Sequence, residues 1–122
     1  MTRLSVVVPC FNESETIIEL LESVISQPCV GEIVVVDDGS TDGSKEKLQA
    51  LNHEKVRVVI FPKNRGKGAA IREGFSIVSL PYVIIQDADL EYSPTEYQRM
   101  LDAMIVIFPL TCFTLWGFTS QT

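Results

Sequence analysis

Four short apolar runs rich in β-branched residues recur along the chain, and their alternation with helix-like segments constrains the fold most strongly. The runs cover residues 4–9, 32–38, 56–62 and 82–89. The segments between them, at 14–27, 43–52 and 66–79, have helical spacing of apolar residues. Strands that alternate with helices predict a mainly parallel sheet with helices on both faces, so the expected fold class is α/β.

The composition limits the chain to one modest domain and excludes several classes of function. With 122 residues, 46% of them hydrophobic, it can bury a single core. A net charge of −6 argues against a nucleic-acid partner. The three cysteines form no C-x-x-C pair and His53 is the single histidine, which indicates neither a zinc site nor a disulfide framework. The N-terminus does not resemble a secretory signal, so we expect a cytoplasmic protein.

Polar residues follow all four predicted strands where each strand ends. Glu13 comes after the first strand, and the loops 37–44, 62–68 and 87–94 follow the other three. Right-handed crossovers between parallel strands place these loops at one edge of the sheet, where ligands of open α/β sheets bind. The sequence therefore predicts that four polar loops converge on one crevice.

The fourth loop carries three carboxylates at alternate positions, Asp87, Asp89 and Glu91. In an extended chain, residues two apart point to the same side, so these side chains can face one point in the crevice. One or two carboxylates together with substrate phosphates are a typical ligand set for Mg²⁺ or Mn²⁺. The spacing alone leaves a solubilising acidic turn as the alternative.

The second loop begins with two adjacent acids, Asp37 and Asp38, followed by Gly39, which permits a tight turn. Adjacent carboxylates repel each other, and one of them can accept hydrogen bonds from a nucleobase or from ribose hydroxyls. The side chains expected to cap the first and second helices are Ser14 and one of Ser40, Thr41 and Asp42.

The third loop is basic and precedes a predicted helix. Lys63, Arg65 and Lys67 surround two glycines, and cations beside a helix N-terminus predict an anion site that can pair with the acidic loop across a diphosphate. Arg72 is either a phosphate contact or a surface residue. The chain contains neither a Walker A motif nor G-x-G-x-x-G after the first strand, which disfavours P-loop and classical dinucleotide folds. No Ser-His-Asp or Cys-His set can be assembled, and we assign no catalytic residue.

Four ordered motifs, "SVVVPCFNESETI", "IVVVDDGSTDGS", "KNRGKGAAIREGF" and "IIQDADLEYSPTEY", together resemble the N-terminal half of family 2 glycosyltransferases of the GT-A type. The resemblance covers about residues 3–104 and is strongest to polyprenyl-phosphate sugar transferases of the dolichyl-phosphate mannose synthase kind. It implies a Rossmann-like nucleotide-diphospho-sugar transferase fold that is apparently truncated.

The resemblance also implies roles for individual residues. Those that match the nucleotide-sugar site of the family are Pro9, Phe11, Glu13, Val36, Asp38, Lys67, Arg72, Asp87, Ala88 and Asp89. Those that match its metal ligands are Asp87, Asp89 and Glu91. Within these sets Phe11 stands where an aromatic ring stacks near the base, and Lys67 and Arg72 are the weaker matches.

The implied reaction transfers mannose or glucose from GDP-mannose or UDP-glucose to a polyprenyl or dolichyl phosphate, with inversion at the anomeric carbon. Mg²⁺ or Mn²⁺ would offset the charge that develops on the leaving diphosphate. A lipid phosphate is already anionic and can attack without a strong enzymic base. Such an acceptor implies peripheral association with the cytoplasmic face of a membrane.

The last segment departs from the family pattern. Residues 103–122 contain no charged residue and approach the roughly 20 apolar residues that span a bilayer, but Pro109 and Gly117 interrupt them. We expect a nucleotide-sugar-binding part at 1–104 and a divergent apolar tail at 105–122, with a membrane anchor as the alternative for the tail.

Two other functions compete with sugar transfer. One is a truncated, non-catalytic remnant that binds nucleotide or a partner. The other, a nucleotidylyltransferase, requires a glycine-rich basic loop after the first strand, where this chain has "PCFNESE".

Overall fold

The computed structural model describes residues 4–88 and 94–98, and it confirms the predicted alternation of strands and helices. The elements in chain order are β1 (Leu4–Cys10), α1 (Ile17–Ile25), β2 (Val30–Asp37), α2 (Ser44–Ala50), β3 (Val56–Ile60), α3 (Lys67–Ile77), β4 (Tyr82–Ile85) and the short 3₁₀ helix η1 (Pro94–Glu96). The strand β4 ends at Ile85, so the acidic residue Asp87 lies beyond the strand.

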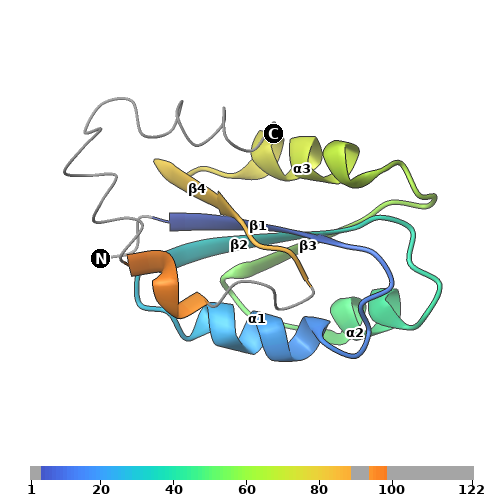
Figure 1. Cartoon of the computed structure of the whole chain (residues 1–122), viewed down its shortest axis with the longest axis horizontal. Coiled ribbons are helices and arrows are strands. Elements are labelled where there is room, and N and C mark those ends of the chain that lie inside the picture. Colours follow the sequence, from blue (N-terminus) through green and yellow to red (C-terminus); the bar gives the residue numbers. More distant parts are fainter. Residues whose placement is uncertain (1–3, 89–93, 99–122) are drawn as a thin grey trace.

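The four strands form one parallel sheet in the order β3-β2-β1-β4. Helices α1 and α2 cover one face and α3 covers the other, as predicted (Figure 1). The chain moves outward from β1 to β3 and then returns to place β4 on the opposite side of β1. This reversal creates a switch point between β1 and β4, where open α/β sheets bind ligands at the carboxyl ends of the strands.

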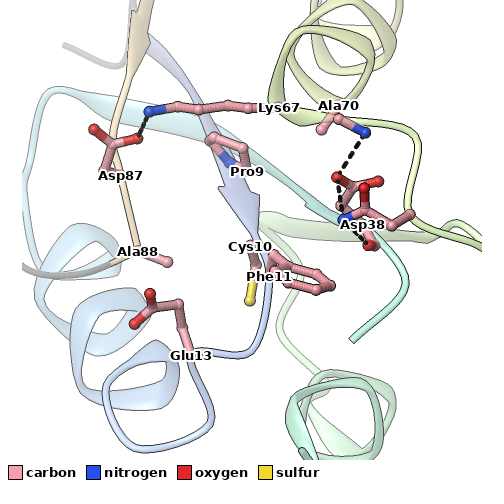
Figure 2. Close-up of a pocket in the computed structure, with 11 residues that line it drawn as sticks. Pro9, Cys10, Phe11, Glu13, Asp38, Lys67, Ala70, Asp87 and Ala88 are labelled. Carbon is pink, nitrogen blue, oxygen red and sulfur yellow. Dashed lines mark hydrogen bonds and ion pairs between the residues drawn. The ribbon is translucent and has the colours of Figure 1, made fainter. Parts of the chain in front are cut away.

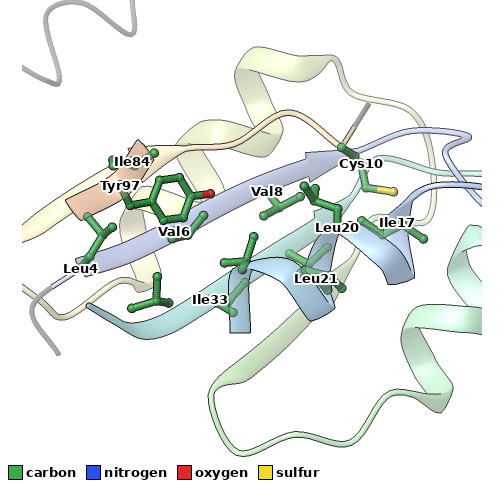
Figure 3. Close-up of a cluster of buried hydrophobic side chains, with 14 of the residues drawn as sticks. Leu4, Val6, Val8, Cys10, Ile17, Leu20, Leu21, Ile33, Ile84 and Tyr97 are labelled. Atoms are coloured by element: carbon green, nitrogen blue, oxygen red, sulfur yellow. The ribbon is translucent and has the colours of Figure 1, made fainter. Parts of the chain in front are cut away.

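The strand β1 is buried on both faces because it lies between two neighbouring strands and two helical layers. Val6 and Val8 pack against Leu20 and Leu21 of α1 (Figure 3). The opposite face is filled by a smaller cluster of Val34, Val36, Phe61 and Ala70 beneath α3. Full burial of a valine or leucine side chain contributes about 1.5–3 kcal/mol. The sheet edge that carries the polar loops is thus built on a rigid base.

The helix starts differ from the sequence prediction. The N-cap of α1 is Thr16 rather than Ser14, and the Thr16 side chain makes no capping hydrogen bond to its own helix. Its hydroxyl donates instead to the main-chain oxygen of Ala88, 2.7 Å away. The N-cap residue of α2 is Gly43, while the carboxylate of Asp42 accepts from the N–H of Ser44 in the first turn. The side chain of Thr16 thus makes a tertiary contact and no local cap.

The loop after β1 is joined to the loop after β2 by hydrogen bonds between segments far apart in sequence. They run from Asn12 N to Ser40 Oγ (2.8 Å), from Thr41 N to Asn12 Oδ1 (2.8 Å), from Glu13 N to Ser44 Oγ (3.0 Å) and from Ser14 N to Asp42 Oδ2 (3.1 Å). Asn12 adopts a positive φ of 53°, which asparagine tolerates better than most residues. The polar motif "STDGS" thus clamps the two loops together.

In the part of the chain that the structure covers, no helix is long and apolar enough to cross a membrane. The predicted tail at 105–122, the boundary at residue 104 and the acids Asp89 and Glu91 lie outside the described residues.

Helix α3 approaches β1 through a glycine. A Cβ atom on Gly74 would lie 2.4 Å from Cγ1 of Val7, well inside van der Waals contact. Gly68, in the first turn of the same helix, has more room, because a Cβ there would meet only the end of the Arg72 side chain at 3.4 Å.

We expect Gly74→Ala to lower the free energy of unfolding by about 1–3 kcal/mol, because the added methyl group overpacks the α3–β1 contact. Gly68→Ala is the matched control, and its higher helix propensity should leave stability unchanged or raise it by up to about 1 kcal/mol. Urea denaturation of both variants measures the difference. Equal effects of the two substitutions would contradict the close approach at Gly74.

The hydrogen bonds that Asp42 accepts from Ser14 and Ser44 predict that the stability of the fold depends on pH in the acid range. Hydrogen bonds from Ser44 and Ser14 lower the pKa of Asp42 from 3.8 to about 2. Because the folded pKa is depressed, the ionised carboxylate stabilises the fold fully above pH 3.8, and that contribution is lost as the pH falls toward 2.

Asp42→Asn should therefore lower the free energy of unfolding at neutral pH, and the gap from the parent chain should narrow as the pH falls from 3.8 toward about 2. Denaturant titrations at several pH values measure this gap. Glu46→Gln removes an exposed carboxylate from α2 and controls for the change in net charge. A gap that stays constant over this pH range would contradict the role of the Asp42 charge.

Candidate functional site

A pocket of about 490 Å³ opens at the carboxyl edge of the sheet, where the four loops meet (Figure 2). Its volume falls in the roughly 300–1,000 Å³ range of small-molecule sites. The lining residues come from the ends of all four strands and from the start of α3: Pro9, Cys10, Phe11, Glu13, Asp38, Asn64, Gly66, Lys67, Ala70, Asp87 and Ala88. The predicted convergence of loops is confirmed.

Asp38 fixes the shape of the basic loop. Its carboxylate is only 3% exposed and accepts hydrogen bonds from the N–H of Arg65 (2.6 Å), the N–H of Gly66 (3.0 Å) and Nδ2 of Asn64 (3.1 Å). A buried carboxylate needs such donors, because leaving it unpaired is strongly unfavourable. The loop is thus folded around the acid at the end of the neighbouring strand.

A glycine lets these two loops touch. Gly39 has a φ of +76°, and a Cβ atom there would lie 2.5 Å from the main-chain nitrogen of Asn64 and 2.7 Å from the carbonyl carbon of Lys63. Any side chain at this position would push the basic loop away from Asp38. The guanidinium of Arg65 also lies over the ring of Phe61 at 4.5 Å, which holds the loop from its other side.

The adjacent acid, Asp37, has a different environment. It is fully buried, and its Oδ2 accepts from the N–H of Ser40 at 3.0 Å. Its Oδ1 has no hydrogen-bond partner among residues 4–88 and 94–98. Asp37 does not line the pocket, so the acid pair divides into one turn-forming residue and one residue at the pocket wall.

An ion pair crosses the pocket. The ammonium of Lys67, at the start of α3, lies 2.6 Å from Oδ1 of Asp87, beyond β4 (Figure 2). The Lys67 side chain is 59% exposed and that of Asp87 is 24% exposed. Such an exposed pair contributes at most about 1 kcal/mol, so another ligand can displace either partner.

Glu13 and Phe11 complete opposite sides of the opening. The carboxylate of Glu13 lies on the same side as Asp87 and Ala88 in Figure 2, whereas the ring of Phe11 lies nearer to Asp38. Phe11 is 45% exposed, which leaves a ring face available to a ligand. Exposure of a large apolar ring beside a pocket is typical of a stacking contact.

Cys10 lines the pocket, and burial raises its pKa to about 12, with a further contribution from the charge of Asp37. The thiol is therefore protonated at neutral pH. Only a thiolate is an effective nucleophile, so the pocket does not carry a reactive cysteine. This agrees with the absence of a Cys-His pattern in the sequence.

The oxygen donors at the pocket suit a hard cation. Asp87 offers a partly exposed carboxylate, and Mg²⁺ is typically held by one or two carboxylates together with substrate phosphates. Within the described residues no group of three or more His, Cys, Asp or Glu side chains gathers into a complete metal site. The described residues would thus supply only part of the ligands of such a cation.

Most residues that the sequence analysis singled out meet at this pocket. Those that line it are Pro9, Phe11, Glu13, Asp38, Lys67, Asp87 and Ala88. Val36 is fully buried beneath α3 and Arg72 is exposed on α3, and neither lines the pocket. The roles of all these residues remain predictions.

The lining residues that sequence reasoning did not place in the site are Cys10, Asn64, Gly66 and Ala70. Cys10 is the last residue of β1 and lies between Pro9 and Phe11. This position at the carboxyl end of a strand could have indicated that it lines the site. Asn64 and Gly66 lie in the basic loop, but their contacts with Asp38 depend on a segment 26–28 residues away.

Similar sequences carry the names of polyprenyl-phosphate sugar transferases. The chain is 39% identical over 114 residues to dolichyl-phosphate beta-glucosyltransferase of Saccharomyces cerevisiae, a match that covers 83% of this chain and 34% of the relative. It is 37% identical over 108 residues to undecaprenyl-phosphate 4-deoxy-4-formamido-L-arabinose transferase of Yersinia enterocolitica, covering 81% and 32%. The chain thus spans about a third of the length of these relatives.

Solved structures share the fold. Residues 1–349 of S. aureus TarS superpose with a TM-score of 0.71 at 30% identity, covering 86% of this chain and 32% of that one, and a second TarS structure contains UDP. A mannosyltransferase from Pyrobaculum calidifontis in complex with GDP-Man and Mn²⁺ superposes with a TM-score of 0.65 at 33% identity, covering 71% and 27%.

The family model for glycosyl transferase family 2 matches residues 5–109, which includes every described residue of the pocket. This match, the parallel sheet and the pocket at its switch point lead to one conclusion: the chain belongs to glycosyl transferase family 2 and has the GT-A type of α/β fold.

Proposed function

We propose that the chain is the nucleotide-sugar-binding part of a glycosyltransferase that transfers a hexose to a polyprenyl phosphate. The observation that carries this proposal is the pocket itself. In it Lys67, which follows the basic loop, forms an ion pair with Asp87, the first residue of the acidic segment after β4. A nucleoside diphosphate with a divalent cation matches that pairing of charges. The names of the yeast and Yersinia relatives support a lipid-phosphate acceptor, and with it peripheral association with a membrane.

The nucleoside would bind between Phe11, Glu13 and Asp38. An ionised carboxylate has about four acceptor positions, and Asp38 already uses three of them for the basic loop. It can therefore accept at most one further hydrogen bond from a base or a ribose hydroxyl. The main contribution of Asp38 to nucleotide binding is then the shape of the loop, with Phe11 as the stacking surface.

The diphosphate would bind at the N-terminal end of α3. Lys67 supplies a cation there, and the first N–H groups of an 11-residue helix have no partner within the helix. Asp87, with Asp89 and Glu91 in the predicted acidic segment, would hold Mg²⁺ or Mn²⁺, which would stabilise the charge on the leaving diphosphate. Lys67 and Asp87 must separate for both roles.

The transfer itself would be a single displacement. A phosphate oxygen of the acceptor forms a bond to the anomeric carbon, the bond from that carbon to the diphosphate breaks, and the configuration inverts. An anionic acceptor needs no proton abstraction, so this step requires no general base. The donor would be UDP-glucose or GDP-mannose.

A second candidate function is binding of a nucleotide sugar without transfer. Every described residue that lines the pocket lies between residues 9 and 88, and the chain spans about a third of the length of the relatives that it matches. Incubation with radiolabelled UDP-glucose or GDP-mannose and dolichyl phosphate separates the two candidates. Label in the lipid fraction supports transfer, and binding without label supports the second.

We expect Mn²⁺ to raise the affinity for UDP or GDP. In Asp87→Asn and in Asp89→Asn, the factor by which Mn²⁺ raises this affinity should be smaller by about tenfold or more. Isothermal titration calorimetry with and without Mn²⁺ measures it. Glu54→Gln removes an exposed carboxylate near the opposite edge of the sheet and should bind like the parent chain. Metal-independent binding in all four proteins would exclude the proposed cation site.

Lys67→Met should weaken UDP binding about tenfold, because it removes a charged donor to the diphosphate, while uridine binding stays unchanged. Lys63→Met is the matched control, since Lys63 lies in the same loop but does not line the pocket. Titrations of UDP and uridine against both variants provide the comparison. An equal loss in both variants would indicate a general effect of charge instead of a contact at Lys67.

A further inference from the structure

The acidic segment beyond β4 is tied to the start of α1. The last ladder contact of β4 is the hydrogen bond from Gln86 N to the carbonyl of Val7 (2.9 Å), so the chain leaves the sheet at Asp87. Immediately afterwards the carbonyl of Ala88 accepts from the hydroxyl of Thr16 at 2.7 Å, across 72 residues of sequence. This contact holds the main chain between Asp87 and Asp89.

The Thr16 hydroxyl has a single proton to donate. Its oxygen also lies 3.3 Å from Oε2 of Glu13, but the 2.7 Å separation from Ala88 O is the ordinary length of an O–H···O hydrogen bond. The proton is therefore directed to Ala88. The Glu13 carboxylate then keeps its acceptor capacity for a donor in the pocket.

The main chain of Thr16 is held as firmly as its side chain. The N–H groups of Thr16 and Ile17 both donate to the carbonyl of Glu13, at 3.1 Å and 2.9 Å. Glu13 and Ala88 therefore contact the same rigid turn, and both line the pocket. Thr16 therefore joins the turn that carries Glu13 to the main chain next to Asp87.

The Thr16 hydroxyl serves a contact outside its own helix. An N-cap threonine usually accepts a hydrogen bond from the second or third N–H of its own helix, and Thr16 makes no such bond. A residue that departs from a local rule while making a specific contact near a site is a candidate for a functional role. Its hydroxyl donates to Ala88, and its main chain has the αR conformation rather than the extended conformation typical of an N-cap.

We propose that Thr16 is a positioning residue that, through Ala88, orients Asp87 for cation-assisted binding of the nucleotide. This rests on the proposed function of the pocket, because it assigns to Thr16 the alignment of Asp87 relative to Glu13. Thr16 touches neither the nucleotide nor the cation in this role. It acts through the carbonyl of Ala88.

The test compares Thr16→Val, which keeps the shape and removes the hydroxyl, with Thr16→Ser, which keeps the hydroxyl. In the full chain, UDP and GDP affinities are measured with and without Mn²⁺. In Thr16→Val, the factor by which Mn²⁺ raises the affinity should be about fivefold smaller than in the parent chain, which is the effect of one hydrogen bond. The affinity without Mn²⁺ should stay unchanged. Thr16→Ser should restore the parent behaviour.

Ser26→Ala is the matched control, because it removes a hydroxyl that donates to the main-chain oxygen of Ser23 at the other end of α1. It should leave the Mn²⁺-dependent gain unchanged. An equal loss of affinity in Thr16→Val with and without Mn²⁺ would show a merely structural role and overturn the proposal. So would a Thr16→Val variant that matches the parent chain.

Amide hydrogen exchange without nucleotide or metal keeps this test separate from that of the proposed function. The amides of residues 86–88 should exchange about fivefold faster in Thr16→Val than in the parent or in Thr16→Ser. If the parent chain shows no Mn²⁺-dependent binding, the proposed function fails, and unchanged exchange at 86–88 would overturn the anchor itself.

Discussion

The buried carboxylate of Asp38 is the interaction on which the binding edge depends. It lies where β2 ends, and it accepts hydrogen bonds from two main-chain N–H groups and one side-chain amide of the basic loop, 26–28 positions later in the chain. Removing an ion from water costs several kcal/mol unless such donors replace the solvent. The loop consequently has one favourable path, which leads directly into α3 and places Lys67 opposite Asp87. Gly39 makes this path sterically accessible.

The fold was predictable from the sequence because its signals are local and repeated. Apolar β-branched runs alternate with amphipathic segments, and the handedness of parallel crossovers then brings the polar loops to one edge. The helix caps were less predictable. Ser14 has the chemistry of an N-cap, but Thr16 is the N-cap residue, and its hydroxyl donates to a partner 72 residues away. Contacts between distant segments leave no local pattern in one sequence.

The same limit applies to the site. The pair Asp37 and Asp38 suggested a ligand role for at least one acid, and their environments prove to differ sharply. Asp37 is fully buried and accepts a hydrogen bond within the turn from Ser40, whereas Asp38 contacts the basic loop and lines the pocket. The side chains of two adjacent residues point to opposite sides of a strand end. The surrounding loops then determine which groups each side chain contacts. The acids Asp89 and Glu91 lie beyond the described residues.

Charge balance explains why a nucleotide and a cation would bind here together. Glu13 and Asp87 place negative charge at the pocket, Lys67 is the opposing cation among its lining residues, and Lys67 is already paired with Asp87. A diphosphate alone would attract Lys67 but would leave Asp87 facing added negative charge. A cation alone would take Asp87 and release Lys67 without an anion to meet it. If both bound, each would replace one partner of the ion pair, and each would then raise the affinity for the other by the same factor.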